Sequence, residues 1–256
     1  MAPRPPLIIA HRGASVDAPE NTLAAFALAV RQGAQMIELD TRPSADGELV
    51  VFHDDTTERW NGQPELIGTL PWSQLAQLDL SGERIPRLRE VCDWAHVTGM
   101  ALNIEIKVPG IELQVAQHIA AAQLKEQVIV SSFYPQALRS LYMIDPQIKL
   151  GVLMGVRSLR PRIRAREAWP LWTLRHLHAS SWHPAVQLPF LPRIIHAVQR
   201  RGYTVNVWTV DDPVLLRQLI AVGVDGIITN RPSVLHDIIE SERIVPQRPA
   251  RWRRPR

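Results

Sequence analysis

Two short stretches of the chain alternate acidic and apolar residues, MIELD at residues 36–40 and NIEIK at residues 103–107. In an extended strand, residues two positions apart point to the same face, so Glu38 lies with Asp40 and Glu105 lies with Lys107. Buried carboxylates are costly to desolvate unless a cation neutralises them. Three such groups predict a divalent cation held by Glu38, Asp40 and Glu105. Because these ligands are all oxygen atoms, they favour Mg²⁺ or Ca²⁺ over zinc.

A second interpretation of the same carboxylates needs no metal. Lys107 or Arg12 could neutralise them in a purely structural ion-pair network, which is the commoner arrangement for a random pair of buried acids. The convergence of three carboxylates at one end of a sheet favours the metal. Both interpretations require something cationic among the acids.

Two histidines follow strand-like segments and are expected near these acids. His11 ends LIIAH, and His53 ends LVVFH. The second segment follows Asp46-Gly47, a dipeptide typical of two-residue hairpin turns. With the turn centred there, residues whose numbers sum to 93 lie opposite one another, so Asp40 is expected to face His53.

The residue types indicate a reaction. A pair of histidines beside a metal supplies the acid and the base that hydrolysis requires. Arg12 adds a planar donor that suits bidentate binding of phosphate. A divalent cation, two histidines and an arginine at one place predict phosphoryl chemistry.

The elements that must position these residues alternate along the chain. Helical patterns such as NTLAAFALAVRQGA and PRIIHAVQRRGY separate most of the short apolar runs, which is typical of a parallel sheet. The gap between residues 41 and 48 is too short for a helical crossover, so one strand pair must be antiparallel. Nine strands are expected, at residues 7–11, 36–41, 49–53, 101–107, 127–132, 149–154, 177–181, 204–210 and 224–229.

Eight of these runs suit a (β/α)₈ TIM barrel, with residues 49–53 as an extra β-hairpin strand at the C-terminal rim, where such barrels keep their active sites. Residues 1–242 form one barrel domain in this interpretation, and residues 243–256 form a basic, disordered tail. Residues 56–86 are rich in Gly, Pro and polar residues and are expected to form a lid or side wall.

Charge argues against a nucleic-acid partner. The 256-residue chain has a net charge of +4, but five of its 29 basic residues are arginines in the last nine positions. The rest holds 24 basic against 25 acidic residues, so the body is near neutral. A second arginine cluster, RSLRPRIRAR at residues 157–166, is most simply a solvated face, although it could make weak contact with a membrane surface.

Other features narrow the location and the site. No apolar run reaches the roughly 18 residues of a membrane span, and MAPRPPLIIAHRG is unlike a signal peptide, so a cytoplasmic location is expected. Cys92 is the single cysteine and is given no catalytic role. Six further histidines lack comparable context and are left outside the site: His96, His118, His176, His178, His183 and His196.

The segment DAPENTLAAF carries a helix start signal. Asn21 or Thr22 is expected to cap the helix, with Pro19 stiffening the approach. Glu20 is expected in a supporting role, either bound to Arg12 or as part of the metal site.

Taken together, these motifs resemble the glycerophosphodiester phosphodiesterase family, within the PLC-like phosphodiesterase superfamily, whose members adopt a TIM-barrel fold. The resemblance covers about residues 7–235. It rests on AHRGASVDAPENTLAAFALAVRQGAQMIELDTRPSADGELVVFHDDT, then ERIPRLREV, NIEIK, VIVSSF, VNVWTV and VDGIITNRPS. So many separated motifs in the same order make the resemblance highly specific.

The resemblance implies a role for each candidate residue. His11 and His53 would be the general acid and base, although which of them is the base stays open. Arg12 would bind the phosphate and Lys107 would add positive charge near it. Phe133 and Trp208 would line the wall that receives the glycerol or the leaving group, although both could instead be core aromatics. The implied metal ligands are Glu38, Asp40 and Glu105.

The sequence departs from the family pattern in three places. RWNGQPELIGTL lacks the usual paired threonines before Asn-Gly, and residues 78–84 form a shorter excursion than is common. Both departures concern substrate preference. Asn230 stands where Asp is frequent, a neutral change expected to retune a hydrogen bond while catalysis survives.

The implied reaction is hydrolysis of a small-molecule glycerophosphodiester to glycerol 3-phosphate and an alcohol. The attacking oxygen could come from water or from the substrate's own neighbouring hydroxyl, which would give a cyclic phosphate first. One alternative is a lysophospholipase D type enzyme that acts at a membrane surface. Another is a catalytically silent module that binds phosphate or lipid. The headgroup and the oligomeric state stay open.

Overall fold

The structure, a computed structural model, describes residues 5–155 and 170–244. Within these ranges nine strands form one sheet, and eight of them are parallel neighbours that close into a ring, because the first pairs with both the second and the last. The strands are β1 (Leu7–His11), β2 (Met36–Pro43), β3 (Leu49–Val51), β4 (Ala101–Ile106), β5 (Val128–Ser132), β6 (Lys149–Met154), β7 (Ser181–Pro184), β8 (Thr204–Val207) and β9 (Gly226–Thr229). The predicted TIM barrel with an extra hairpin strand, β3, is confirmed.

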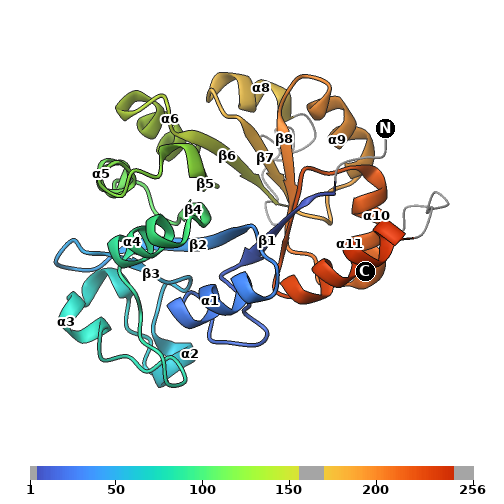
Figure 1. The fold of residues 1–256 in the computed structure, drawn as a ribbon. Coiled ribbons are helices and arrows are strands. Elements are labelled where there is room, and N and C mark those ends of the chain that lie inside the picture. Colours follow the sequence, from blue (N-terminus) through green and yellow to red (C-terminus); the bar gives the residue numbers. More distant parts are fainter. Residues whose placement is uncertain (1–4, 156–169, 245–256) are drawn as a thin grey trace.

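Helices lie outside the ring and connect most of its strands (Figure 1). Local signals set their ends: Thr22 caps the first helix by accepting from the Ala25 amide at 3.1 Å, and Gly99 ends another with a φ of 70°. The helices are α1 (Leu23–Arg31), α2 (Glu58–Asn61), α3 (Trp72–Leu75), α4 (Leu88–Thr98), α5 (Glu112–Ala121), α6 (Pro135–Ile144), α8 (Pro170–His176), α9 (Leu191–Gln199), α10 (Pro213–Val222) and α11 (Pro232–Ile244).

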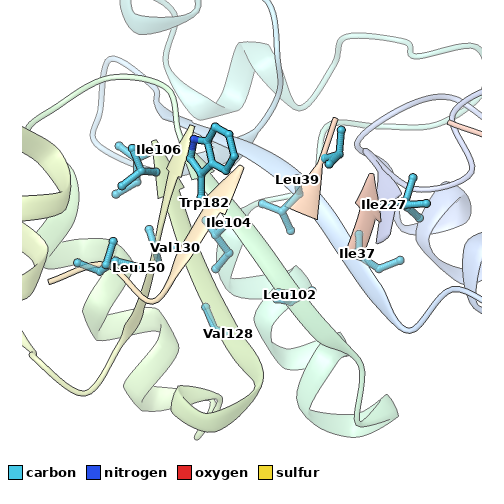
Figure 2. Packing of buried hydrophobic residues seen from close by; sticks show 14 of the residues in the cluster. Ile37, Leu39, Leu102, Ile104, Ile106, Val128, Val130, Leu150, Trp182 and Ile227 are labelled. Carbon is cyan, nitrogen blue, oxygen red and sulfur yellow. The ribbon is translucent and has the colours of Figure 1, made fainter. Parts of the chain in front are cut away.

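The main hydrophobic core lies between the ring and these helices. Ile37 and Leu39 alternate with the two acids of β2 and are fully buried in it. Each buried side chain of this size contributes roughly 1.5–3 kcal/mol, so the outward faces of the strands stabilise the barrel and leave the inward faces to other roles. Figure 2 shows part of this core, with labels on Ile37, Leu39, Leu102, Ile104, Ile106, Val128, Val130, Leu150, Trp182 and Ile227.

The hairpin register differs from the prediction by one residue. Thr41 pairs with Val51, so numbers sum to 92 and the turn has three residues, 45–47, closed by the Ser44 amide on the Glu48 carbonyl at 2.9 Å. Ser44 causes this, because its hydroxyl accepts from the Glu48 amide at 3.0 Å and donates to Asp46 at 2.6 Å. Asp40 therefore lies opposite Phe52, not His53, as the Phe52 amide bond to the Asp40 carbonyl at 3.0 Å shows.

The seventh strand also lies further along the chain than predicted. The prediction of a strand at residues 177–181 was wrong, because Leu177 still bonds back to the Thr173 carbonyl as an extension of α8. His178 then turns the chain with a φ of 53°. The strand begins at Ser181, and its polar end places His183 inside the barrel with no exposed surface.

Residues 56–86, called the excursion below, pack against one side of the barrel through a second small core. Figure 1 shows its helices α2 and α3 beside β3. This core contains Val50 of β3, Phe52 just after that strand, and four residues of the excursion, all buried: Ile67, Leu75, Leu80 and Ile85. This region is a packed side wall.

Some predictions fall on parts of the chain that the structure does not describe. The arginine cluster at residues 157–166 and residues 245–256 of the predicted tail lie outside the described residues, whereas residues 243 and 244 of that tail belong to α11. In the described ranges, each helix is too short or too polar to cross a lipid bilayer.

Candidate active site

Polar side chains fill the inside of the barrel where β2 and β4 lie next to each other. The strand register pairs Glu38 with Asn103 and Asp40 with Glu105, and each of these residues is at least 92% buried. The alternation that buries Ile37 outside directs these four groups inward. The prediction that the two acidic stretches share one face of one sheet is confirmed.

A cavity of about 70 Å³ opens at this end of the barrel. Eight of the nine residues predicted for the site line it, and the ninth, Asp40, lies behind Arg12 and Lys107. The cavity has room for an ion and several water molecules, since in this measure one water molecule needs only about 10–15 Å³. Its lining residues are His11, Arg12, Glu38, His53, Asn103, Glu105, Lys107, Phe133, Leu153, Trp208 and Ile228.

Two protein cations contact the carboxylates. Arg12 Nε lies 3.1 Å from Asp40 Oδ2, and Lys107 Nζ lies 3.3 Å from Asp40 Oδ1 and 3.0 Å from Glu105 Oε1. Glu38 instead accepts from the Arg12 backbone amide at 3.1 Å. The ion pairs of the metal-free interpretation are therefore present, but they are centred on Asp40, and within the described part of the chain no lysine or arginine forms an ion pair with Glu38.

The pKa values of the three acids differ for this reason. Burial and the charges of Asp40 and Glu105 raise the pKa of Glu38 well above its usual value. Burial and Asp40 raise the pKa of Glu105 to about 7. Burial also opposes ionisation of Asp40, but Lys107 and Arg12 outweigh it and hold its pKa below the usual range. The two cationic side chains thus stabilise the charged form of Asp40 more than that of Glu38 or Glu105.

These residues fit a divalent cation. Oxygen atoms of Glu38, Asp40 and Glu105 all lie within 4.8 Å of one another. Asn103 Oδ1 is a buried atom without a hydrogen-bond partner among the described residues, which is costly in a protein interior. Hard cations such as Mg²⁺ and Ca²⁺ bind clusters of carboxylate and amide oxygens, so the donor set suits either ion.

His11 stands at the end of β1 beside Glu38, with 3.9 Å between His11 Nε2 and Glu38 Oε2. Its other nitrogen, Nδ1, lies 2.7 Å from the side-chain oxygen of Asn230, which follows β9. Burial and the neighbouring Arg12 lower the pKa of His11 to about 4. The imidazole is therefore neutral near pH 7 and has one nitrogen directed to the cavity.

His53 also lines the cavity and lies just beyond β3. Its Nδ1 is 2.8 Å from Asp54 Oδ1, and Asp54 Oδ2 accepts from Arg59 of the excursion at 2.6 Å. Burial lowers the pKa of His53, while Asp40 and Asp54 act in the opposite direction. Although the predicted pairing with Asp40 was wrong, the structure brings His53 to the same cavity as His11.

Glu20 connects the two sides of the rim. Its Oε1 accepts from Arg12 at 3.1 Å and from Arg59 at 2.5 Å. Glu20 also lies within 4.8 Å of His53 and Asp54, but arginines already contact both acids of that group. The predicted contact between Glu20 and Arg12 is thus confirmed.

Asn21 does not cap α1, contrary to one of the two expectations. It adopts a φ of 59°, donates from its amide to Asp40 Oδ2 at 3.0 Å and accepts from the Asp40 backbone amide at 3.3 Å. Asn adopts this left-handed conformation more readily than most residues, so an asparagine at this position is itself a sequence signal for it. Asp54 and Arg59 were not predicted as site residues from the sequence, because their role depends on contacts with distant segments.

Two aromatic rings form one wall of the cavity. The centroids of Phe133 and Trp208 are 5.5 Å apart and the ring planes meet at 83°, an edge-to-face contact. Trp208 is anchored by its indole nitrogen, which donates to the His183 carbonyl at 2.7 Å. Phe133 is 40% exposed, so this wall offers an apolar surface at the mouth.

Carboxylates for a cation, two histidines and an arginine around one cavity at the C-terminal rim of a parallel barrel define a class of site. This arrangement is typical of enzymes that cleave phosphate esters with the help of a bound divalent cation. Comparisons with known proteins support the same class. Residues 11–234 match the model of the glycerophosphoryl diester phosphodiesterase family.

Individual relatives agree over most of their length. The chain is 35% identical over 246 residues to a glycerophosphodiester phosphodiesterase of Caldanaerobacter subterraneus subsp. tengcongensis, which covers 91% of this chain and 97% of that protein. A phosphodiesterase of Oleispira antarctica, solved with its product sn-glycerol-3-phosphate, has a TM-score of 0.77 at 31% identity, covering 92% and 97%. A glycerophosphodiester phosphodiesterase of Agrobacterium tumefaciens has a TM-score of 0.78 at 29% identity, covering 91% and 99%. The chain belongs to the glycerophosphoryl diester phosphodiesterase family.

Proposed function

We propose that this chain hydrolyses glycerophosphodiesters to glycerol 3-phosphate and an alcohol, with a divalent cation and with His11 and His53 as acid and base. One observation carries the proposal: both histidines line the cavity that is bordered by Glu38 and Glu105. Family membership supports the substrate class. The Oleispira antarctica relative, solved with sn-glycerol-3-phosphate, supports that product.

Glu38, Asp40 and Glu105 would hold the cation. When bound, such an ion neutralises phosphoryl oxygens and stabilises the charge that develops on them. Arg12 supplies fixed donors at the same cavity, and Lys107 adds an ammonium group whose pKa is raised by Asp40 and Glu105 against the effect of burial. Both side chains therefore stay charged when phosphate binds.

The partners of the two histidines support different roles. His11 contacts the neutral Asn230 and is unprotonated near pH 7, so its free nitrogen can take a proton from the attacking oxygen. His53 contacts the carboxylate of Asp54, which stabilises a protonated ring and suits donation to the leaving alcohol. General acid or base catalysis of this kind contributes ~10²–10⁴ in rate for each group.

The rest of the substrate would lie over the rim. The cavity, which is lined by Arg12 and Lys107, would receive the phosphate. Phe133 and Trp208 would contact the apolar edge of the glycerol or the leaving group.

A direct assay tests this function. The full chain, purified and supplied with Mg²⁺ or Ca²⁺, should release choline or ethanolamine from a panel containing glycerophosphocholine, glycerophosphoethanolamine and lysophosphatidylcholine, with glycerol 3-phosphate as the second product of the first two. Faster turnover of the first two is expected, and EDTA should abolish it. His96→Ala is a matched control, because His96 is exposed on α4 away from the cavity and should leave the rate unchanged.

Two results would contradict the proposal. Absence of turnover on the whole panel would contradict the proposed reaction. Full turnover after rigorous chelation would contradict its dependence on a divalent cation. Preference for lysophosphatidylcholine would assign a lipid substrate instead.

A further inference from the structure

A carboxylate outside the cavity controls the orientation of the amide that contacts His11. Asp211 follows β8 and accepts three hydrogen bonds from the end of β9 and the next residue. The donors are Thr229 Oγ1 at 2.9 Å, the Asn230 backbone amide at 2.8 Å and Asn230 Nδ2 at 2.6 Å. Asp211 does not line the cavity.

These bonds decide which way the Asn230 side chain faces. An ionised carboxylate has no hydrogen to donate, so it must face the NH₂ group of the amide. The amide oxygen of Asn230 then points to the other side, where Ser15 Oγ lies at 2.9 Å and His11 Nδ1 lies at 2.7 Å.

The amide orientation in turn decides the tautomer of His11. An oxygen atom can only accept, so Nδ1 of a neutral His11 must carry the proton. The lone pair is then left on Nε2, the nitrogen 3.9 Å from Glu38 on the cavity side. The opposite tautomer would present an N–H to the cavity and could not accept a proton.

We propose that Asp211 is a positioning residue that acts through Asn230 to keep the His11 Nε2 lone pair directed at the reacting group. This inference rests on the proposed acid and base function of His11. Asp211 reaches His11 only through a neutral amide, so it fixes the tautomer without placing a second charge against the ring. A carboxylate thus lies near this histidine, with the side chain of Asn230 between the two groups.

Asp211→Asn gives a specific expectation. The amide oxygen introduced at position 211 would still accept from Thr229 and from the Asn230 backbone, because turning it would set the new NH₂ group against two donors. That NH₂ group would then face the Asn230 side chain and reverse its amide. The NH₂ group of Asn230 would face His11, and the proton of His11 would move to Nε2.

The double variant Asp211→Asn with Asn230→Asp restores the pattern. The new carboxylate at position 230 accepts from His11 Nδ1 and from the NH₂ group at position 211. Net charge is unchanged. Asp212→Asn is a matched control in the same loop, because its oxygen can still accept from the Val214 and Leu215 amides at the start of α10.

The experiment combines two readouts on the Mg²⁺-loaded protein. Long-range ¹H–¹⁵N correlation spectra report which ring nitrogen of His11 carries the proton, with the signal assigned by its loss in His11→Gln. Steady-state kinetics on glycerophosphocholine separate kcat from KM. Asp211→Asn is expected to move the proton to Nε2 and lower kcat roughly 10- to 100-fold with KM within about twofold, because a wrong tautomer removes a proton acceptor and leaves binding intact.

The double variant should return the proton to Nδ1 and recover most of kcat, and Asp212→Asn should match the wild type. A wild-type spectrum with the proton on Nε2 would overturn the proposal even if a variant failed to fold. So would an unchanged tautomer in folded Asp211→Asn, or a double variant as impaired as the single one. Absence of turnover in the wild type would contradict the proposed function instead. The spectra would still test whether Asp211 sets the tautomer of His11 through Asn230.

Discussion

The two histidines of the site are held by different kinds of structure. His11 ends a strand of the ring, and its Nδ1 contacts a neutral amide that follows the last strand. His53 lies beyond the hairpin strand outside the ring, and its Nδ1 contacts the carboxylate of Asp54. We call the side with His11, Asn230 and Asp211 the barrel half of the rim. The side with His53, Asp54 and Arg59 is the excursion half.

This difference shows how one cavity can give two similar side chains different chemistry. In the barrel half the histidine side chain is 18% exposed and has a pKa of about 4, so its neutral form is fixed by burial. In the excursion half the histidine side chain is 32% exposed; burial lowers the pKa of this ring as well, but its carboxylate partner acts in the opposite direction. A geometry built by the ring tolerates little change, whereas one built by surface ion pairs is more adjustable.

The most severe test removes what both halves share. Glu105→Gln keeps the shape of the side chain but removes one of the three negative charges at the cavity, so cation binding should weaken and kcat/KM should fall by at least about 10³, since the loss of a bound cation costs several kcal/mol of charge stabilisation. Calorimetric titration with Mg²⁺ and turnover of glycerophosphocholine measure the two effects.

Glu112→Gln is the matched control. Glu112 is also a buried glutamate, but its carboxylate accepts from the Gly110 amide at the start of α5, away from the cavity. It should bind Mg²⁺ and turn over substrate as the wild type does. Equal losses in both variants would mean that Glu105 matters only for folding.

The second test separates the two halves. His11→Ala and His53→Ala should each lower kcat by ~10²–10⁴ on glycerophosphocholine, because each removes a proton-transfer group. A substrate with a p-nitrophenol leaving group needs no protonation of that group, so His53→Ala should recover most of its rate there while His11→Ala should not. The reverse pattern would exchange the two roles, and equal recovery would contradict the division of the rim.

The third test concerns pH and the cation. In the ion-free protein the pKa of Glu105 is about 7 and that of Glu38 is also raised. A protonated carboxyl cannot bind the ion, and protonation increases as pH falls, so Mg²⁺ affinity should fall as pH drops through about 7. The loss should be about tenfold per pH unit for each proton displaced.

Calorimetric titrations at pH 5, 6, 7 and 8, in buffers of different ionisation enthalpy, measure the affinity and the protons released. In Glu105→Gln the slope should decrease, because one titrating group is gone. An affinity that is constant between pH 5 and 8 would contradict the raised pKa values.

The sequence predicted the shared features of the two halves better than their differences. Strand alternation is a local property with a period of two, so it predicted that Glu38, Asp40 and Glu105 point inward. The count of alternating elements was enough to predict the ring. Both findings depend only on neighbours along the chain or on the order of elements.

Features that depend on distant contacts were harder to predict. His11 and Asn230 are 219 positions apart, and nothing near His11 specifies its partner. The hairpin register was missed by one residue because the Ser44 hydroxyl favours a three-residue turn over the common two-residue form. Arg59 is one of many charged residues in the excursion, and only folding brings it to Asp54 and Glu20.

The smallest expected effect concerns this arginine and the adjustable character of the excursion half. Arg59 is 46% exposed and contacts Asp54 at 2.6 Å and Glu20 at 2.5 Å. Exposed ion pairs are worth about 0–1 kcal/mol, so Arg59→Gln should lower kcat by no more than about fivefold, with little change in the melting temperature. Because salt screens exposed charges, the difference from the wild type should shrink as the salt concentration rises to about 1 M.

Arg84→Gln is the matched control, since Arg84 is 51% exposed in the same excursion and pairs with Glu90, away from the cavity. An identical response of the two variants would show that the ion pairs of Arg59 do not position His53, and the two halves of the rim would then be equally rigid.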